Sequence, residues 1–384
     1  MDLTIDAEDA AFQERARAWL AAHVPDEPLP SLETGEGFAA HREWERELAA
    51  DHWSVVSWPE RYGGQDAGLV RWLLFEEAYY AAGAPGRVSQ NGISLLAPTL
   101  FDYGTDEQRA RILPSMARGE TVWAQAWSEP EAGSDLASLR STAVRAPGGW
   151  LLNGQKAWSS RAAFADRAFG LFRTDPATAR TDRPHRGLTY LMFDLRAPGV
   201  TVRPVPRLDG KPAFAELFLD DVFVPDADVI GEPGQGWRIA MSATGSERGL
   251  TLRSPGRFLA GAAELERQWR DAGDPDDTAL RDRVADAVIG ARAYELFTWT
   301  HASRALDGED IGAESSLNKV FWSEYDVALH ETALELDVLE RELADSRWAE
   351  GYVFALAGPI YAGTNEIQRD IIAERLLGLP KGRR

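Results

Sequence analysis

The spacing of hydrophobic residues changes twice along the chain. Up to residue 119, apolar positions recur every three or four residues, as in "AAFQERARAWLAAH" and "FAAHREWERELAADHW", which predicts amphipathic helices. From residue 120 to 233 the period is two, which is typical of strands, and from residue 234 to the end the helical period returns. The sequence therefore predicts a mostly helical α+β protein with a helical domain over 1–119, a β domain over 120–233 and a helical domain over 234–384.

Five short segments of the middle region are rich in aromatic and aliphatic residues and are separated by Gly, Pro and Asp. The predicted strands are "TVWAQAW", "GWLLNGQKAW", "RAFGLFR", "LTYLMFDL" and "AELFLDDVFV". Within the second of these segments, Asn153-Gly154 predicts a two-residue hairpin turn, because both central residues of that turn need positive φ. Residues 173–187, "RTDPATARTDRPHRG", predict an exposed loop.

Composition removes several classes of function. Acidic residues exceed basic ones and the formal net charge of −20 is spread along the chain, so no basic surface is available for nucleic acid. The chain has no cysteine, and its six histidines are scattered, which argues against thiol chemistry and a metal centre. The N-terminal segment is acidic and no apolar run approaches about 18 residues, so we expect a soluble cytoplasmic protein without membrane insertion.

Two stretches of the middle region have chemistry suited to a cofactor. In "WSEPEAGSD" (127–135), Gly133 and Ser134 allow main-chain N–H groups to approach an anion closely, although an ordinary turn after a strand has the same composition. In "QKAWSS", Trp158 and Ser160 lie two residues apart on one strand face. A flat ring beside a hydroxyl suits an aromatic ligand, and a tryptophan packed in the core is the alternative.

A carboxylate and an arginine stand together on the helix predicted after "GQGW". Ala240, Thr244, Glu247 and Thr251 are spaced by four, three and four residues, which places them on one helix face, and Arg248 follows Glu247. A solvated surface ion pair is one interpretation. If that face is buried instead, desolvation raises the carboxyl pKa and gives a base suited to neutral pH.

The C-terminal stretch "IYAGTNEIQRDIIAERLLGLP" pairs a small-residue turn with a helix. Gly358–Thr364 has the glycine spacing of a phosphate loop, but it lacks the lysine before the threonine and does not follow a strand, so a nucleoside triphosphate site is rejected. What remains is a turn in which Thr364 caps a helix that carries Ile367, Ile371, Leu376 and Leu377. A helix start of this kind suits an anion.

Taken in this order, "WSEPEAGSDLASLRSTA", "LLNGQKAWSS", "GQGW…ER" and the C-terminal stretch resemble the acyl-CoA dehydrogenase family over the whole chain. The resemblance implies an N-terminal helical domain, a central β domain and a C-terminal four-helix bundle. It also implies FAD held between the β domain and the C-terminal helices, with an acyl-CoA substrate against its face. It assigns Trp127 and Ser128 to the flavin edge, Gly133 and Ser134 to the pyrophosphate, Trp158 and Ser160 to the flavin and its N5, Gly363, Thr364 and Glu366 to the flavin and its phosphates, and Arg248 to the substrate region.

The resemblance also implies a reaction and a base. The family removes an α-proton with a glutamate and passes the β-hydride to flavin N5, which forms a trans-2-enoyl-CoA. Many members place this glutamate between the Tyr and Gly of the terminal turn, where this chain has Ala362. A second branch places it on the helix after the β domain, directly before an arginine, and Glu247 matches that arrangement. The main-chain N–H of Ala362 is then expected to bind the thioester oxygen.

Two family patterns that bind the adenosine end of a neighbouring subunit's FAD are missing. An Arg-x-x-Phe-Gly segment is replaced by "AELERQWRDAGDP", and Gln followed by Gly-Gly-x-Gly is absent before the terminal turn. A branch associated with sterol side-chain degradation is similar in both respects and pairs two dehydrogenase-like chains as α2β2. The resemblance thus implies a tetramer in lipid or steroid catabolism that acts on a bulky or branched acyl chain, with an electron-transfer flavoprotein as acceptor. A non-catalytic scaffolding subunit and an acyl-CoA oxidase remain the alternatives.

Overall fold

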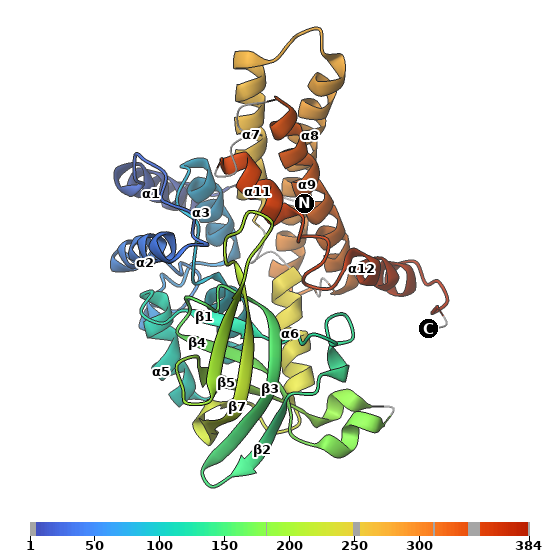
Figure 1. Ribbon diagram of the computed structural model, residues 1–384. Coiled ribbons are helices and arrows are strands. Elements are labelled where there is room, and N and C mark those ends of the chain that lie inside the picture. The colour runs from blue at the N-terminus through green and yellow to red at the C-terminus, as the bar shows by residue number, and fades with distance from the viewer. Residues whose placement is uncertain (1–4, 182, 249–253, 310–311, 337–345, 383–384) are drawn as a thin grey trace. The chain divides into compact units, whose positions relative to one another are not determined.

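The computed structural model in Figure 1 describes residues 5–181, 183–248, 254–309, 312–336 and 346–382; the side chains of Arg180 and of residues 243–248 are not part of this description. The chain forms two compact units. The helical unit comprises Met1–Asp26, Ala67–Ala84 and Arg248–Arg384, and the sheet unit comprises Glu27–Asp66 and Pro85–Glu247.

The described part of the sheet unit contains an eight-stranded sheet with the order β6-β7-β3-β2-β4-β5-β8, and β1 pairs in parallel with β4. The strands are β1 (Trp123–Ala126), β2 (Thr142–Ala146), β3 (Gly149–Ser160), β4 (Arg167–Arg173), β5 (Leu188–Asp194), β6 (Val200–Val205), β7 (Phe214–Pro225) and β8 (Val229–Ile230). Each of the five predicted strands is present. The predicted loop at 173–187 contains two short 3-10 helices, Pro176–Arg180 and Pro184–Gly187.

The predicted hairpin at Asn153-Gly154 is wrong. Strand β3 runs straight through these residues, and the β2–β3 turn lies earlier, where Gly148 has φ 75°. The register of β3 against β7 shifts between Leu152 and Gly154, where three steps along β7 face two along β3, so the extra residue lies on β7. Gly154 has φ 144°, and a Cβ there would lie 2.3 Å from Oγ of Ser141 on the neighbouring segment. The glycine is needed for close backbone approach inside the sheet, a tertiary requirement that the local pattern does not reveal.

The central strand β4 is buried on both faces. Its residues alternate between two hydrophobic clusters, with Phe169 and Leu171 in one and Ala168 and Phe172 in the other. The helices of this unit are α2 (Gly35–Ala50), α4 (Ala97–Tyr103), α5 (Asp106–Ala117) and α6 (Gly236–Arg248), whose last residue belongs to the helical unit. Helices α4, α5 and α6 contribute to the first cluster, so they cover the face that carries Phe169.

The helical unit is built from α1 (Ala7–His23), α3 (Leu69–Ala81), α7 (Pro255–Ala272), α8 (Thr278–Leu306), α9 (Ser315–Leu336), α11 (Arg347–Ala355) and α12 (Asn365–Ile371). Helix α7 packs on α3 and α8, and α9 packs on α8, α11 and α12. Phe258 of α7 makes edge contacts with Tyr294 of α8 and Tyr325 of α9, with ring centroids 5.3 Å apart in both pairs. These aromatic contacts tie the three long helices together. No described helix has the length and apolar character that a membrane crossing requires.

Candidate active site

The structure brings the first two predicted stretches together inside the sheet unit. The loop that follows β1 begins with Trp127, which is buried and meets Tyr190 edge-on with centroids 6.0 Å apart. The carbonyl of Ser128 accepts a 2.9 Å hydrogen bond from the N–H of Ala157 on β3. "WSEP" and "QKAW", about 30 residues apart in sequence, therefore lie side by side.

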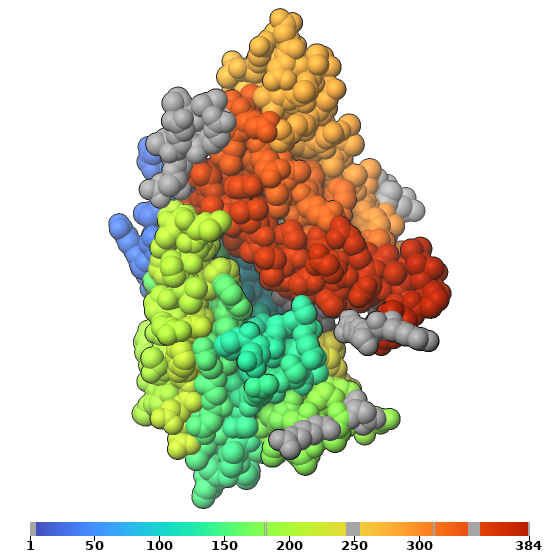
Figure 2. All heavy atoms as spheres, turned by 45° about the vertical axis from the view of Figure 1, so that its right-hand side comes forward, coloured from blue at the N-terminus to red at the C-terminus, as the bar shows by residue number. Residues whose placement is uncertain are grey.

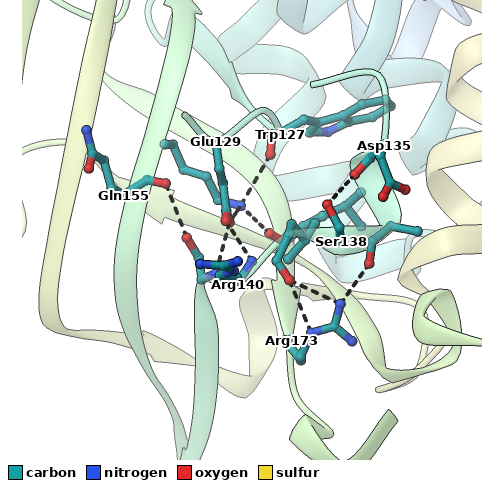
Figure 3. A network of polar contacts seen from close by, with 12 residues as sticks. Trp127, Glu129, Asp135, Ser138, Arg140, Gln155 and Arg173 are labelled. Atoms are coloured by element: carbon teal, nitrogen blue, oxygen red, sulfur yellow. Dashed lines mark hydrogen bonds and ion pairs between the residues drawn. The ribbon is translucent and has the colours of Figure 1, made fainter. Parts of the chain in front are cut away.

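A buried ion pair supports this meeting point. Lys156 is 0% exposed, and its Nζ lies 2.8 Å from Oε1 of Glu129, 2.7 Å from the carbonyl oxygen of Leu171 and 3.3 Å from that of Trp127. Figure 3 shows the polar contacts of Glu129 and of the Trp127 carbonyl in this network. Burial alone raises the pKa of Glu129, but the Lys156 ammonium and hydrogen bonds from Arg140 and Ser141 outweigh it, so the net pKa is lowered. Glu129 is therefore ionised and pairs with the Lys156 ammonium.

Hydrogen bonds also fix the C-terminal end of the loop, residues 137–141. Glu129 accepts from the main-chain N–H groups of Arg140, at 2.6 Å, and Ser141, at 2.9 Å. The buried Arg173 donates to the carbonyls of Ala137 and Leu139.

Between these anchors, Gly133 and Ser134 are exposed, and a Cβ at Gly133 would meet nothing within 4 Å. In Figure 2 this segment is the turquoise surface of the sheet unit next to the light-green 3-10 helices. The predicted anion-binding residues thus stand at the open tip of an anchored loop.

Trp158 has an unusual conformation for a residue within a strand. Its φ of 59° lies in the left-handed region, and the register of β3 slips against β7 between Lys156 and Ser159. The residue is 64% exposed, and its ring meets Phe214 edge-on. Ser159 is buried and Ser160 half-buried, so Trp158 and Ser160 keep to the open side of the strand as their spacing predicts. A strained residue that presents a large ring to solvent suits a flat aromatic ligand.

The predicted terminal turn lies in the helical unit. Ala362 has φ 56° and Gly363 φ 79°, so two successive residues are left-handed. The side-chain amide of Gln368 donates to the carbonyl of Ala362 at 2.9 Å and to that of Gly363 at 3.3 Å. Thr364 caps α12 by accepting from the N–H of Ile367, as the sequence predicts. Leu376 and Leu377, predicted as part of an amphipathic helix face, are exposed.

A second buried lysine supports this turn. Lys319 of α9 is 0% exposed, and its Nζ lies 2.7 Å from Oδ1 of Asn365, the first residue of α12. Ser323 donates to the same oxygen at 3.1 Å, and the Asn365 amide donates to Glu324 at 3.0 Å. Glu366, the next residue, is exposed, and its own main-chain N–H together with the Thr364 hydroxyl lowers its pKa. The turn is therefore tied to α9 through one amide side chain.

Glu247, which the resemblance assigns as the base, lies next to the end of a described segment, Arg248. The side chains of Thr244, Glu247 and Arg248, and all of Thr251, lie outside the described residues, whereas the backbone of α6 is helical through Arg248. Seven residues make almost two full turns, so position 247 lies on the same helix side as Ala240. Ala240 is fully buried in the sheet unit. This helix side begins in the core rather than on the surface.

The supporting residues Glu129, Lys156, Lys319 and Gln368 are absent from the sequence prediction. One signal was available for Lys156, because Trp150, Leu152 and Lys156 share the inward-facing phase of a strand and a lysine in that phase requires a buried partner. For Lys319 and Gln368 the helical pattern gives no comparable indication, because the residues around Lys319 on α9 include serine and asparagine.

The order of helices, sheet and helices along the chain, the anchored loop and the left-handed terminal turn agree with the acyl-CoA dehydrogenase class that the sequence motifs predict. Family models confirm the class: the N-terminal, middle and C-terminal domains of acyl-CoA dehydrogenase match residues 6–120, 124–222 and 234–377. The chain belongs to the acyl-CoA dehydrogenase family.

The chain is similar over its length to curated members of this family and to solved structures. The chain is 36% identical to the acyl-CoA dehydrogenase IpdE1 of Mycolicibacterium smegmatis, over 96% of this chain and 97% of that protein. It is 30% identical to a chain of the ChsE4-ChsE5 complex of Mycobacterium tuberculosis, with a TM-score of 0.82 and both chains fully covered. A structure described as the Tcur3481-Tcur3483 steroid ACAD matches with a TM-score of 0.87 at 27% identity, again over both full chains.

Proposed function

We propose that this chain catalyses FAD-dependent α,β-dehydrogenation of an acyl-CoA thioester to a trans-2-enoyl-CoA, on a bulky or branched acyl chain such as a steroid side chain. Family membership supports the reaction, and the steroid ACAD relative supports the substrate class. The observation that carries the proposal is Ala362, a left-handed residue whose carbonyl is held by Gln368. The turn keeps its fixed backbone but has only a methyl group at 362.

A base must then come from another element. Glu366 is close in sequence, but its lowered pKa makes it a weak proton acceptor. Glu247 on α6 is the better candidate, because helical spacing places it on the side of the helix that begins with the buried Ala240. We assign proton removal from the substrate α-carbon to Glu247 and hydrogen bonding of the thioester oxygen to the main-chain N–H of Ala362.

The residues of both units fit FAD in chemical type. When bound, FAD supplies the hydride acceptor that side chains lack. Exposed Trp158 and half-buried Ser128 and Ser160 offer a ring face and hydroxyls, and open space at Gly133 allows an anion to approach main-chain N–H groups. We assign these contacts to the following residues: Trp127, Ser128, Gly133, Ser134, Trp158, Ser160, Gly363, Thr364 and Glu366.

An α C–H next to a thioester is a weak acid at neutral pH. A hydrogen bond to the carbonyl stabilises the charge that develops as the proton leaves, and a carboxylate beside the α-carbon receives that proton. Gln368 fixes the Ala362 turn before substrate arrives, so little reorganisation is needed. We assign Arg248, next to Glu247 in sequence, to the substrate region.

The proposed assembly is an α2β2 tetramer with a second dehydrogenase-like chain. Two similar structures are named for pairs of chains, ChsE4-ChsE5 and Tcur3481-Tcur3483. The missing adenosine-binding patterns in this sequence agree with a partner that completes the FAD sites. The proposed electron acceptor is an electron-transfer flavoprotein.

The test is an anaerobic titration of the co-purified heteromer with CoA thioesters, from short branched acids to steroid side chains, followed by loss of flavin absorbance. We expect bleaching with a bulky thioester and at least a 1,000-fold slower rate in Glu247→Gln with FAD retained, on the order of the loss when a general base is removed. Glu266 on α7 is partly exposed and pairs with Arg270, so Glu266→Gln is the matched control for loss of a carboxylate. Unchanged turnover in Glu247→Gln contradicts the base assignment, absence of bleaching favours a scaffolding subunit, and oxygen uptake without an acceptor favours an oxidase.

A further inference from the structure

We propose that Lys156 and Glu129 form a positioning pair that holds the Trp127–Ser141 loop in its cofactor-binding conformation before the cofactor arrives. This inference rests on the proposed function, because it takes FAD as the ligand of the loop. It extends that function to two buried residues that lie behind the loop.

The ammonium group of Lys156 is completely satisfied. A lysine has three N–H donors, and Nζ lies within hydrogen-bond distance of three acceptors: the Glu129 carboxylate and the carbonyls of Trp127 and Leu171. The Phe172 ring packs against it with its centroid 4.8 Å from Nζ. A lysine with full burial and three fixed acceptors has one orientation, so it holds its partners at fixed positions.

Glu129 connects the two ends of the loop. Its Oε1 accepts from Lys156 and from the N–H of Ser141, while its Oε2 accepts from the N–H of Arg140. Trp127 is bound through its carbonyl to the same lysine, so residues 127, 129, 140 and 141 are joined through one pair of charges (Figure 3). The exposed Gly133 and Ser134 lie between Glu129 and Arg140, on the segment whose two ends this ion pair joins.

The Lys156–Glu129 pair also affects Ser128, the residue that follows Trp127 in the loop. An ammonium at the Trp127 carbonyl polarises the peptide that continues to Ser128, which makes the Ser128 N–H a stronger donor. The Ser128 carbonyl is held separately by Ala157. The main-chain groups around Ser128 are thus fixed in direction, which reduces the ordering cost of binding a ligand there.

A purely stabilising role explains the pair less well. Replacing a buried ion pair with apolar residues of similar volume is often neutral or stabilising, so net stability alone gives little reason for the charges. Their specific effect is to select one loop conformation, because the four main-chain partners can be satisfied together only in that arrangement.

The test compares Lys156→Met, the charge-free pair Glu129→Gln/Lys156→Met, and Val222→Ala as a control. Val222 is buried on β7 opposite Leu152, and neither residue belongs to the 127–141 loop, so truncation of Val222 lowers stability and leaves both charges of the pair in place. Two measurements are made on the full-length protein with its partner chain: hydrogen exchange of the 128–141 amides after FAD removal, and the Kd for added FAD.

We expect exchange of the loop amides to rise about 10-fold or more, and the Kd for FAD to rise about 10- to 100-fold, in both Lys156 variants, the scale seen for residues that orient ligand-binding groups. The double variant should recover melting temperature relative to Lys156→Met but not FAD affinity, whereas Val222→Ala should lose melting temperature and keep FAD affinity. This separation distinguishes positioning from a general loss of stability.

Loop exchange and FAD affinity within twofold of wild type in the double variant would overturn the proposal. So would a Val222→Ala variant with the same loss of FAD affinity at equal stability. A wild-type heteromer that binds no FAD contradicts the proposed function instead, and the exchange measurement on the same protein still decides whether the pair orders the loop.

Discussion

Each of the two units contains a fully buried lysine behind a candidate cofactor segment, but the two lysines are bound differently. Lys156 of the sheet unit contacts the carboxylate of Glu129 and two main-chain carbonyls. Lys319 of the helical unit donates to the side-chain amide of Asn365, which Ser323 and Glu324 also contact. The sheet unit therefore fixes a long loop with a direct ion pair, while the helical unit fixes a short turn through a shared amide.

This difference follows from what each segment needs. The loop from Trp127 to Ser141 has main-chain groups at both ends that lack sheet partners, and a charged pair can satisfy several of them at once. The turn at Ala362 leads directly into α12, whose cap supplies part of the bonding, so one amide and Gln368 complete it. Removing a member of the ion pair leaves a buried charge, whereas removing the amide contact leaves fewer unmet groups.

The largest predicted effect on stability is that of Lys156→Met. We expect the free energy of unfolding of the sheet unit to fall by about 3–5 kcal/mol, because Glu129 is left as a buried charge without its cation. Urea unfolding followed by tryptophan fluorescence measures it. Glu129→Gln/Lys156→Met should recover most of the loss, and a double variant as unstable as the single one would show that the charge is not the cause.

Lys319→Met should cost less, about 1–3 kcal/mol, because the Asn365 oxygen keeps its bond from Ser323. The same urea experiment, with hydrogen exchange of the 362–368 amides, measures the loss in the helical unit. A loss larger than that of Lys156→Met would remove the proposed contrast between the two lysines.

The two units also differ in how the pKa of a buried acidic side chain is shifted. Glu129 of the sheet unit lies beside a lysine and has a lowered pKa. In the helical unit, burial raises the pKa of Glu77 on α3 to about 7. The Glu295 carboxylate adds to this rise, and a hydrogen bond from the Trp299 indole opposes it. Between its ordinary pKa of 4.5 and about 7, folded Glu77 keeps a proton that the unfolded chain has released. Its contribution is therefore fully present below about pH 4.5 and is lost as the pH rises through 7.

Glu77→Gln should flatten this dependence and, above pH 7, stabilise the helical unit by about 2 kcal/mol. Thermal melts from pH 5 to 8 measure the change, with Glu266→Gln, which removes a partly exposed carboxylate paired with Arg270, as the control. A slope in Glu77→Gln equal to that of wild type would assign the pH dependence to other groups.

The smallest predicted effect concerns backbone strain. Ala362 and Trp158 are left-handed non-glycine residues, one in each unit. Ala362→Gly should raise the free energy of unfolding by about 1 kcal/mol, since glycine adopts positive φ without a Cβ penalty. Ala293→Gly inside α8 is the opposite control and should lower it by about 1 kcal/mol. Equal signs for the two variants would contradict strain at 362.

Parts of the fold that depend on local pattern were predictable from the sequence. The period of apolar residues identified the helices and the five strands, and Thr364 was identified as a helix cap from its position before an amphipathic segment. The hairpin predicted at Asn153-Gly154 is wrong because this dipeptide lies inside strand β3, where Gly154 packs closely against Ser141. The assignments of cofactor and base residues remain predictions that rest on the motifs.

The sequence by itself determined the order of helical and β regions, the motifs of the acyl-CoA dehydrogenase family and the replacement of a carboxylate by a methyl group at position 362. These properties are local, because periodicity and residue identity act over a few neighbouring positions. Only the tertiary structure decided that Lys156 meets Glu129 and that Lys319 meets Asn365, residues separated by 27 and 46 positions. A buried charge takes its partner from whatever the fold places beside it, and that proximity is not written in spacing along the chain.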